Sequence, residues 1–237
     1  MSTINQLDQA ATVYLRVTFT GATTTSGNNR LDNIVIRGTE VPHTKTLRVK
    51  QFVEGLFNTA TGLMNQASGT SSAQFGTDIA DTIRVELHNA TTPFDVAYTY
   101  NNVDLGTDGM AIIPTIPGTI SGSYYVVIRH RNSLETWSAN PVDFSVASPI
   151  EYDFTTAAGQ AFGNNLKSMG SVYAIWGGDV TQDGLVDGSD LAAVDNASLS
   201  VLMGYNAEDV NGDGLVDGSD MALIDNNSLA VIQLIKP

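Results

Sequence analysis

The chain has 237 residues, no cysteine and a formal net charge of −14 at pH 7. It is long enough for one or two domains with hydrophobic cores, and the lack of cysteine excludes a disulfide framework. The excess of acid argues against a nucleic-acid partner, which needs a basic face, and no stretch is long and apolar enough to span a bilayer.

The acidic residues are concentrated at one end of the chain. Residues 171–237 hold 11 acidic residues and one lysine, a net charge of −10, whereas residues 1–170 hold 14 acidic and 10 basic residues, a net charge of −4. The acidity therefore belongs to the C-terminal segment and says little about the partners of the rest.

Residues 1–42 are predicted to form a β-hairpin. Val13–Thr20 and Leu31–Arg37 alternate apolar and polar side chains on either side of a Thr-, Ser-, Gly- and Asn-rich loop. An isolated hairpin is marginal in water. It resembles the closing hairpin of an upstream jelly-roll or lectin-like sandwich; alternatively, its strands join the next domain.

The start lacks the features of a signal peptide. Taken alone this indicates the cytoplasm, but the hairpin leads us to expect the C-terminal piece of a longer secreted protein.

Residues 43–150 are predicted to form an antiparallel β-sandwich of immunoglobulin or fibronectin III type. Short alternating runs are separated by Gly, Asn, Asp, Ser and Thr, which is typical of such sandwiches. The clearest runs are Leu47–Phe52, Thr82–His88, Phe94–Tyr100, Met110–Ile116, Tyr124–Arg129 and Val142–Val146. The predicted fold class is therefore mainly β, with a small α-helical module at the C-terminal end.

Residues 151–176 are predicted to be a strand-like linker. Tyr152–Phe154 and Val172–Ile175 have strand-like sequences, with a polar stretch between them. We expect this linker to lie along the sandwich and to tie it to the C-terminal segment.

No catalytic motif is found in the sequence. There are three histidines, His43, His88 and His130, and none lies in a metalloprotease, nucleophile-elbow or phosphate-loop motif. His130, Ser133 and Glu135 are close in sequence, but a catalytic triad requires positioned geometry rather than adjacency. We interpret this stretch as a turn followed by a strand that buries a tryptophan, and we predict that the chain is not an enzyme.

The most specific feature is a duplicated, aspartate-rich segment in residues 177–237. Asp179–Asp190 is repeated 30 residues later as Asp209–Asp220, and residues 179–207 share 16 of 29 aligned positions with residues 209–237. Four carboxylates in each loop would repel one another without a cation, and calcium prefers such hard oxygen ligands.

Each loop matches the ligand spacing of an EF-hand-type calcium loop, in which positions 1, 3, 5, 7, 9 and 12 supply oxygens and position 6 is glycine. Position 6 is Gly184 and Gly214, and position 7 supplies only a backbone carbonyl. The predicted ligands of two calcium ions are Asp179, Thr181, Asp183, Leu185, Asp187 and Asp190 in loop 1, and Asp209, Asn211, Asp213, Leu215, Asp217 and Asp220 in loop 2. Thr181 replaces the usual Asn or Asp, which predicts a weaker first site.

A loop followed by a helix, twice, with Asp at position 12 and no helix before the first loop, resembles the type I dockerin module. The resemblance covers residues 177–237. It implies a cohesin-type protein partner that contacts the end of each loop and the helix after it, in either of two orientations related by a pseudo-two-fold axis. The matching residues are Gly188, Ser189, Asp195 and Asn196, and Gly218, Ser219, Asp225 and Asn226. The two glycines depart from the Ser or Thr often seen there.

Helical spacing predicts core positions at Leu191, Val194 and Leu202, and at Met221, Ile224 and Ile232.

We therefore expect a non-catalytic, calcium-binding C-terminal region of an extracellular or cell-surface modular bacterial protein, with a docking module and a β-sandwich spacer. Two alternatives stay open. The calcium module docks on its own β-sandwich as a stabilising cap, or the chain is a fragment of a secreted enzyme or carbohydrate-binding protein whose active domain lies upstream.

Overall fold

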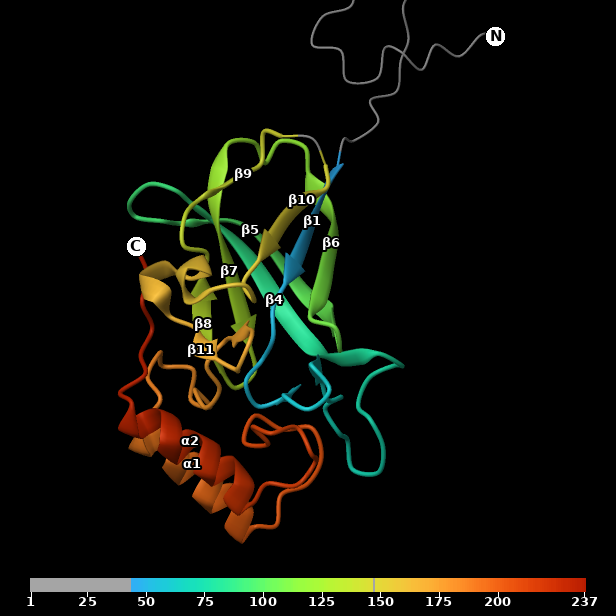
Figure 1. Ribbon diagram of the computed structural model, residues 1–237, viewed down its shortest axis with the longest axis vertical. Coiled ribbons are helices and arrows are strands. Elements are labelled where there is room, and N and C mark those ends of the chain that lie inside the picture. The colour runs from blue at the N-terminus through green and yellow to red at the C-terminus, as the bar shows by residue number, and fades with distance from the viewer. Residues whose placement is uncertain (1–43, 147) are drawn as a thin grey trace, which may run out of the picture. The chain divides into compact units, whose positions relative to one another are not determined.

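The computed structural model describes residues 44–146 and 148–237 (Figure 1). The hairpin predicted in residues 1–42 and the linker histidine His43 lie outside this range. Thr44–Pro237 forms one compact unit.

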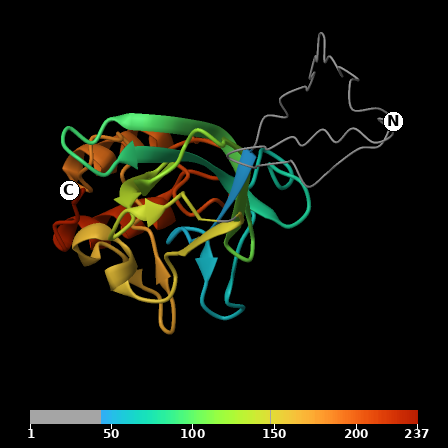
Figure 2. The same cartoon turned by 90° about the horizontal axis from the view of Figure 1, so that it is seen from above.

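Eight strands form one curled sheet around a hydrophobic core (Figure 2). β9 pairs with β7, and the other seven strands follow one path. In order across the sheet they are β10 (Ile150–Asp153), β1 (Thr44–Lys50), β6 (Met110–Pro117), β5 (Val96–Gly106), β4 (Ile79–Asn89), β7 (Ser123–His130) and β8 (Ser133–Trp137), with β9 (Val142–Asp143) beside β7.

Two neighbouring strands of the curled sheet hardly pair. Between β5 and β6, Leu105 opposite Ala111 is the one registered pair. By contrast, β1 pairs with β6 along most of its length, and β4 does so with β5. Side chains from both halves of the sheet, including Leu47, Val85 and Ile128, are buried in the same core. The predicted mainly β fold, with a β domain before a small helical module, is confirmed.

One pair of strands is parallel, and it involves the strand at the start of the predicted linker, for which no direction was predicted. β10 runs parallel to β1, with Leu47 opposite Ile150 and Lys50 opposite Asp153. Alternation of side chains predicts which face a residue occupies but carries no information on strand direction, so the sequence could not reveal this pair.

The predicted linker runs along the β domain. Val53 bridges to Ile175 and Ser138 to Ala161. The linker contains two turns of 3₁₀ helix, Ala158–Gln160 and Phe162–Asn164, and a short hairpin, β11 (Lys167–Ser168) and β12 (Tyr173–Ala174). A second short hairpin, β2 (Phe57–Asn58) and β3 (Leu63–Met64), follows β1 in the β domain. The domain boundaries at residues 150 and 176 stay predictions.

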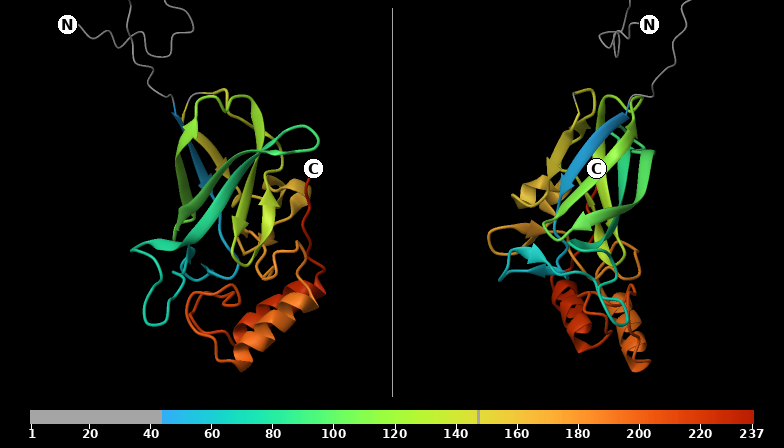
Figure 3. Two further views of the ribbon diagram at one scale, coloured as in Figure 1. Left: turned by 180° about the vertical axis from the view of Figure 1, so that it is seen from behind. Right: turned by 90° about the vertical axis from the view of Figure 1, so that its right-hand side faces the viewer.

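Two helices follow the two aspartate-rich loops, α1 (Gly188–Leu199) and α2 (Gly218–Leu229), and lie side by side (Figure 3). Each begins with the same capping box, in which the N-cap aspartate and the aspartate three residues later satisfy each other's backbone N–H groups. No described helix has the length and hydrophobicity needed to cross a membrane.

A second core lies inside this module. Val186 and Val216, at position 8 of the two loops, are buried together with Val194 and Ile224 on the helices. The other predicted core residues pack against this cluster; they are Leu191, Leu202, Met221 and Ile232. The helical spacing therefore predicted the inward faces correctly.

The helical module contacts the β domain through a buried polar anchor around Asn227. Its Nδ2 donates to Glu54 Oε2 at 2.8 Å and to the Gly177 carbonyl at 2.9 Å, and its Oδ1 accepts from Lys167 Nζ at 2.8 Å. Lys167 also pairs with Glu54 at 2.5 Å. The equivalent residue in the first copy is Ala197, so the repeat differs where α2 faces the β domain.

Substituting Asn227→Ala leaves the Glu54 carboxylate and the Gly177 carbonyl short of a donor in a buried site. We expect a loss of about 1–3 kcal/mol in the free energy of unfolding, measured by urea denaturation with calcium present. The matched control is Asn226→Ala, because Asn226 is exposed on the same helix and its loss should change stability by less than about 0.5 kcal/mol. Equal stabilities of the two variants would contradict the anchor.

Candidate functional site

The two loops have the same local backbone geometry at their tightest point. Gly184 and Gly214 both have a φ of 87°, a conformation that favours glycine, as expected at position 6. In each loop the position 5 carboxylate accepts a hydrogen bond from the position 7 backbone N–H, at 2.9 Å for both Asp183 and Asp213.

The first aspartate of each loop holds a buried carboxylate oxygen without a partner. Asp179 and Asp209 are 2% and 0% exposed, and Oδ1 of each accepts no hydrogen bond from the part of the chain that the structure describes. A buried carboxylate without a compensating partner is costly. Each loop therefore contains an acceptor that fits a cation.

The same two carboxyl groups have raised pKa values. Burial, together with repulsion from Asp190 and Asp183, raises the pKa of Asp179 to about 7. Burial raises the pKa of Asp209 to about 6 against the attraction of the Arg131 guanidinium, and repulsion from Asp220 and Asp213 adds to the rise. Carboxyl groups that repel one another in a buried loop are stabilised when a cation joins them.

The last aspartate of each loop holds the loop closed through the backbone. Asp190 accepts from Thr181 N at 2.9 Å and from Asp187 N at 3.0 Å. Asp220 accepts from Asn211 N and Asp217 N, both at 3.0 Å, and also from Val210 N at 2.8 Å. These carboxylates fix the shape of the loops. Both oxygens of Asp190 and Oδ2 of Asp220 accept one of these bonds each and keep lone-pair capacity, whereas Oδ1 of Asp220 accepts two.

The carboxylates among the predicted calcium ligands do not by themselves converge on one point in either loop. Within residues 44–146 and 148–237, no group of three or more His, Cys, Asp and Glu side chains is arranged to hold a metal ion. The predicted set also uses Thr181, Asn211 and the carbonyl oxygens of Leu185 and Leu215, which such a group does not include. The ligand assignment stays a prediction, and the unpartnered Oδ1 atoms are the observation that fits it.

All eight predicted partner-binding residues are exposed. They lie at the first turn of each helix and on its outer face, as Gly188, Ser189, Asp195 and Asn196, and as Gly218, Ser219, Asp225 and Asn226. Their partner-binding role stays a prediction.

Four apolar residues beside these were missed by the sequence analysis. Leu199 and Leu229 are each 77% exposed, and Val201 and Val231 are 66% and 75% exposed. They lie at the end of each helix and are identical in the two copies. Identity between copies at apolar positions outside the helical core spacing was the signal that could have identified them.

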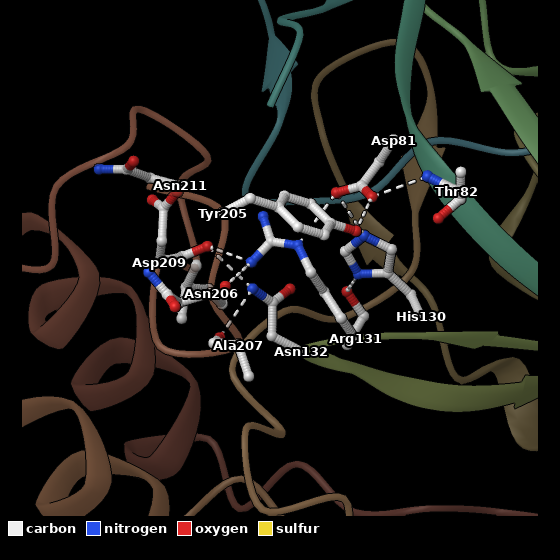
Figure 4. A network of polar contacts seen from close by, with 12 residues as sticks. Asp81, Thr82, His130, Arg131, Asn132, Tyr205, Asn206, Ala207, Asp209 and Asn211 are labelled. Carbon is white, nitrogen blue, oxygen red and sulfur yellow. Dashed lines mark hydrogen bonds and ion pairs between the residues drawn. The ribbon is translucent and has the colours of Figure 1, made fainter. Parts of the chain in front are cut away.

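The structure brings His130 and Ser133 together with Asp81 rather than with Glu135. Figure 4 shows His130 beside Asp81. His130 Nδ1 lies 2.9 Å from Ser133 Oγ, and Nε2 lies 3.1 Å from Asp81 Oδ2. All three residues are buried, with Ser133 and Asp81 fully inaccessible. A substrate cannot reach this serine, so the cluster is structural. Glu135 instead accepts from Trp137 Nε1 at 2.5 Å and pairs with Arg129.

Asp81 also connects the sheet to the segment before loop 2. Arg131 Nε donates to Asp81 Oδ2 at 3.1 Å, and the Tyr205 hydroxyl donates to Oδ1 at 2.6 Å. Although burial alone would raise it, His130 and Arg131 hold the pKa of Asp81 far below its usual range. The carboxylate is therefore charged and fixed.

Comparison with known proteins assigns the helical module. Residues 177–229 match the family model of the dockerin type I domain. No curated protein matches the chain. Among solved structures, the chain is similar to a C-terminal interface mutant of a type II cohesin–X–dockerin complex from Acetivibrio cellulolyticus, at 17% identity and a TM-score of 0.44. It is also similar to an N-terminal interface mutant of that complex, at 16% identity and a TM-score of 0.39. Each match covers 77% of this chain and 94% of the other.

The loops, their capped helices and the family match agree on one assignment. The C-terminal repeat is a type I dockerin-like module, non-catalytic and built for protein docking, of a calcium-binding family, and it follows a β domain.

Proposed function

We propose that the dockerin-like module binds two calcium ions and docks the chain onto a cohesin-type protein outside the cell. The observation that carries the docking role is a pair of identical, exposed surfaces, one on each helix. We define each docking surface by its exposed residues: Gly188, Ser189, Asp195, Asn196, Leu199 and Val201 for the first, and Gly218, Ser219, Asp225, Asn226, Leu229 and Val231 for the second.

The differences between the two copies support this role. Within the helices the copies differ at inward positions, such as Val194 and Ile224, and where α2 faces the β domain, as at Asn227. Exposed residues have the least structural reason to stay the same, and exposed leucine and valine have a cost in water. Two matching surfaces, each with an exposed leucine and valine, indicate a partner that can engage either copy.

Calcium binding is supported by the chemistry of the loops. Bound calcium would supply the positive charge that the clustered carboxylates lack. The residues that would hold it are those predicted from the EF-hand spacing, with Asp179 and Asp209 offering the unpartnered oxygens. Extracellular modules use calcium sites with dissociation constants of about 10⁻⁴–10⁻³ M, which fits a protein outside the cell.

A second function, as a cap on the chain's own β domain, is favoured by the buried anchor at Asn227 and Glu54. The two functions are compatible because the anchor and the docking surfaces use different residues of α2. In this proposal the β domain is a spacer that carries the module, and any catalytic or carbohydrate-binding activity belongs to another part of a modular bacterial protein.

We expect calorimetric titration with calcium to show two binding events, and Asp183→Ala together with Asp213→Ala to abolish both. Chelation should lower the thermal midpoint, because each site contributes about 2.7 kcal/mol when calcium is 100 times its dissociation constant. The matched control is Asp195→Ala with Asp225→Ala, since these aspartates are exposed on the helices outside the ligand set. Absence of binding heat in the unmodified chain, with no change in thermal midpoint, would remove the calcium claim.

Docking is tested with Leu199→Asp and Leu229→Asp, singly and together, against a panel of cohesin modules. Each single variant should keep binding through the other surface, whereas the double variant should lose at least about 30-fold in affinity, the effect of removing an interface hot spot. Ile112→Asp, an exposed residue of β6, is the control and should bind normally. A double variant that still binds normally, while retaining its calcium sites, would contradict the assigned surfaces.

A further inference from the structure

The two calcium loops have nearly the same sequence but differ in their contacts with the β domain. Each loop is bonded to the segment that follows the helix of the other copy: loop 1 to Ile232–Leu234, and loop 2 to Leu202–Gly204 through Val216 N and Gly204 N. Loop 2 begins at Asp209, whose backbone carbonyl accepts two hydrogen bonds from the turn between β7 and β8 (Figure 4). Arg131 donates to it at 2.7 Å and Asn132 Nδ2 at 3.0 Å. The same two side chains also donate to the carbonyls of Asn206 and Ala207. The entry to loop 2 is therefore attached to the sheet.

The middle of loop 2 is also packed on the β domain. Ser68 N donates to the Gly212 carbonyl at 2.9 Å. A Cβ at Gly212 would lie 2.3 Å from Leu56 Cδ2, and one at Gly214 would lie 2.9 Å from the Gly69 carbonyl oxygen. Gly212 replaces Gln182 of loop 1, so the close approach is specific to the second copy.

Loop 1 is held mainly by the segment Ile232–Leu234. Val186 N donates to the Ile232 carbonyl at 2.9 Å, and Leu234 N donates to the Gly184 carbonyl at 2.7 Å. The β domain reaches loop 1 through Asn132 O, which accepts from Gly178 N just before the loop, and through Ser133 O, which accepts from Gln182 Nε2 at 3.4 Å. The carbonyl of Asp179 accepts from Gln182 of its own loop. No described side chain of the sheet donates to it.

Arg131 is itself immobilised. Its Nε is paired with the buried carboxylate of Asp81, and its guanidinium lies 4.5 Å from the centre of the Tyr205 ring. The Tyr205 hydroxyl donates to the same carboxylate. Asn132 is fully buried. Donors that are already fixed hold their acceptor without a further loss of entropy when a ligand binds.

We propose that Arg131 and Asn132 are positioning residues of the second calcium loop, which hold Asp209 in its binding conformation before the ion arrives. This inference rests on the proposed calcium binding and deepens it. It makes the β domain part of the second metal site: loop 2 is organised without calcium, whereas loop 1, with fewer contacts to the β domain, depends more on the ion.

Because Arg131 is charged, the direction in which its substitution changes calcium affinity distinguishes a charge effect from a positioning effect. A guanidinium close to Asp209 repels a calcium ion, so removing its charge alone would strengthen calcium binding. Removing its hydrogen bond to the Asp209 carbonyl would instead loosen the loop and weaken binding. Asn132 carries no charge, so its substitution tests positioning alone.

The test is calorimetric titration of calcium into the full chain with one site disabled. Asp183→Ala leaves loop 2, and Asp213→Ala leaves loop 1. In the Asp183→Ala background we expect Arg131→Met and Asn132→Ala each to weaken calcium binding about tenfold, the effect of losing one or two hydrogen bonds worth about 1 kcal/mol each. In the Asp213→Ala background the same substitutions should change affinity less than about twofold.

Asn165→Ala is the matched control, because Asn165 Nδ2 donates to the Gln233 carbonyl at 2.9 Å, beside loop 1. It should leave loop 2 unchanged. Circular dichroism at the start of each titration checks that the variant is folded. If Arg131→Met does not fold, the Asn132→Ala variant alone tests the positioning role. Unchanged or tighter binding at loop 2, or equal weakening at both loops, would overturn the positioning role. Absence of calcium binding in both backgrounds would instead reject the proposed function, and this inference with it.

Discussion

The C-terminal module depends on two buried carboxylate oxygens that no group among residues 44–146 and 148–237 satisfies. Oδ1 of Asp179 and of Asp209 lies out of water among other acids, and burial raises the pKa of both residues. The backbone hydrogen bonds to Asp190 and Asp220 already close the loops around these atoms. A hard cation at each loop would resolve the repulsion, and it would couple metal binding to the folding of both helices.

The duplication is symmetric on one face and asymmetric on the other. Exposed residues such as Leu199 and Leu229 are the same in both copies. Where the second copy meets the β domain, it has Asn227 and Gly212 in place of Ala197 and Gln182 of the first copy. One copy is thereby anchored to the sheet while both keep the same outer surface. Under the proposed function, this arrangement lets one module make an intramolecular contact and bind an external partner at once.

The strongest sequence signals were local ones. The loop spacing, the glycine at position 6 and the inward residues Val194 and Ile224 depend on neighbours within one turn or one helix, so their pattern is visible in the chain. The parallel pairing of β10 with β1 and the meeting of Asp81 with His130 join residues far apart in sequence. Nothing in the composition of either partner specifies such a contact. The contacts of Asn227 could not be predicted for the same reason, although the difference between Asn227 and Ala197 in the repeat did identify the position as unusual.

The most direct test of this account is a crystal structure of the chain grown with calcium. We predict one ion in each loop, with Oδ1 of Asp179 and of Asp209 among its ligands at about 2.3–2.6 Å. Loops without ion density, in which these two oxygens are protonated or bonded to another protein group, would contradict it.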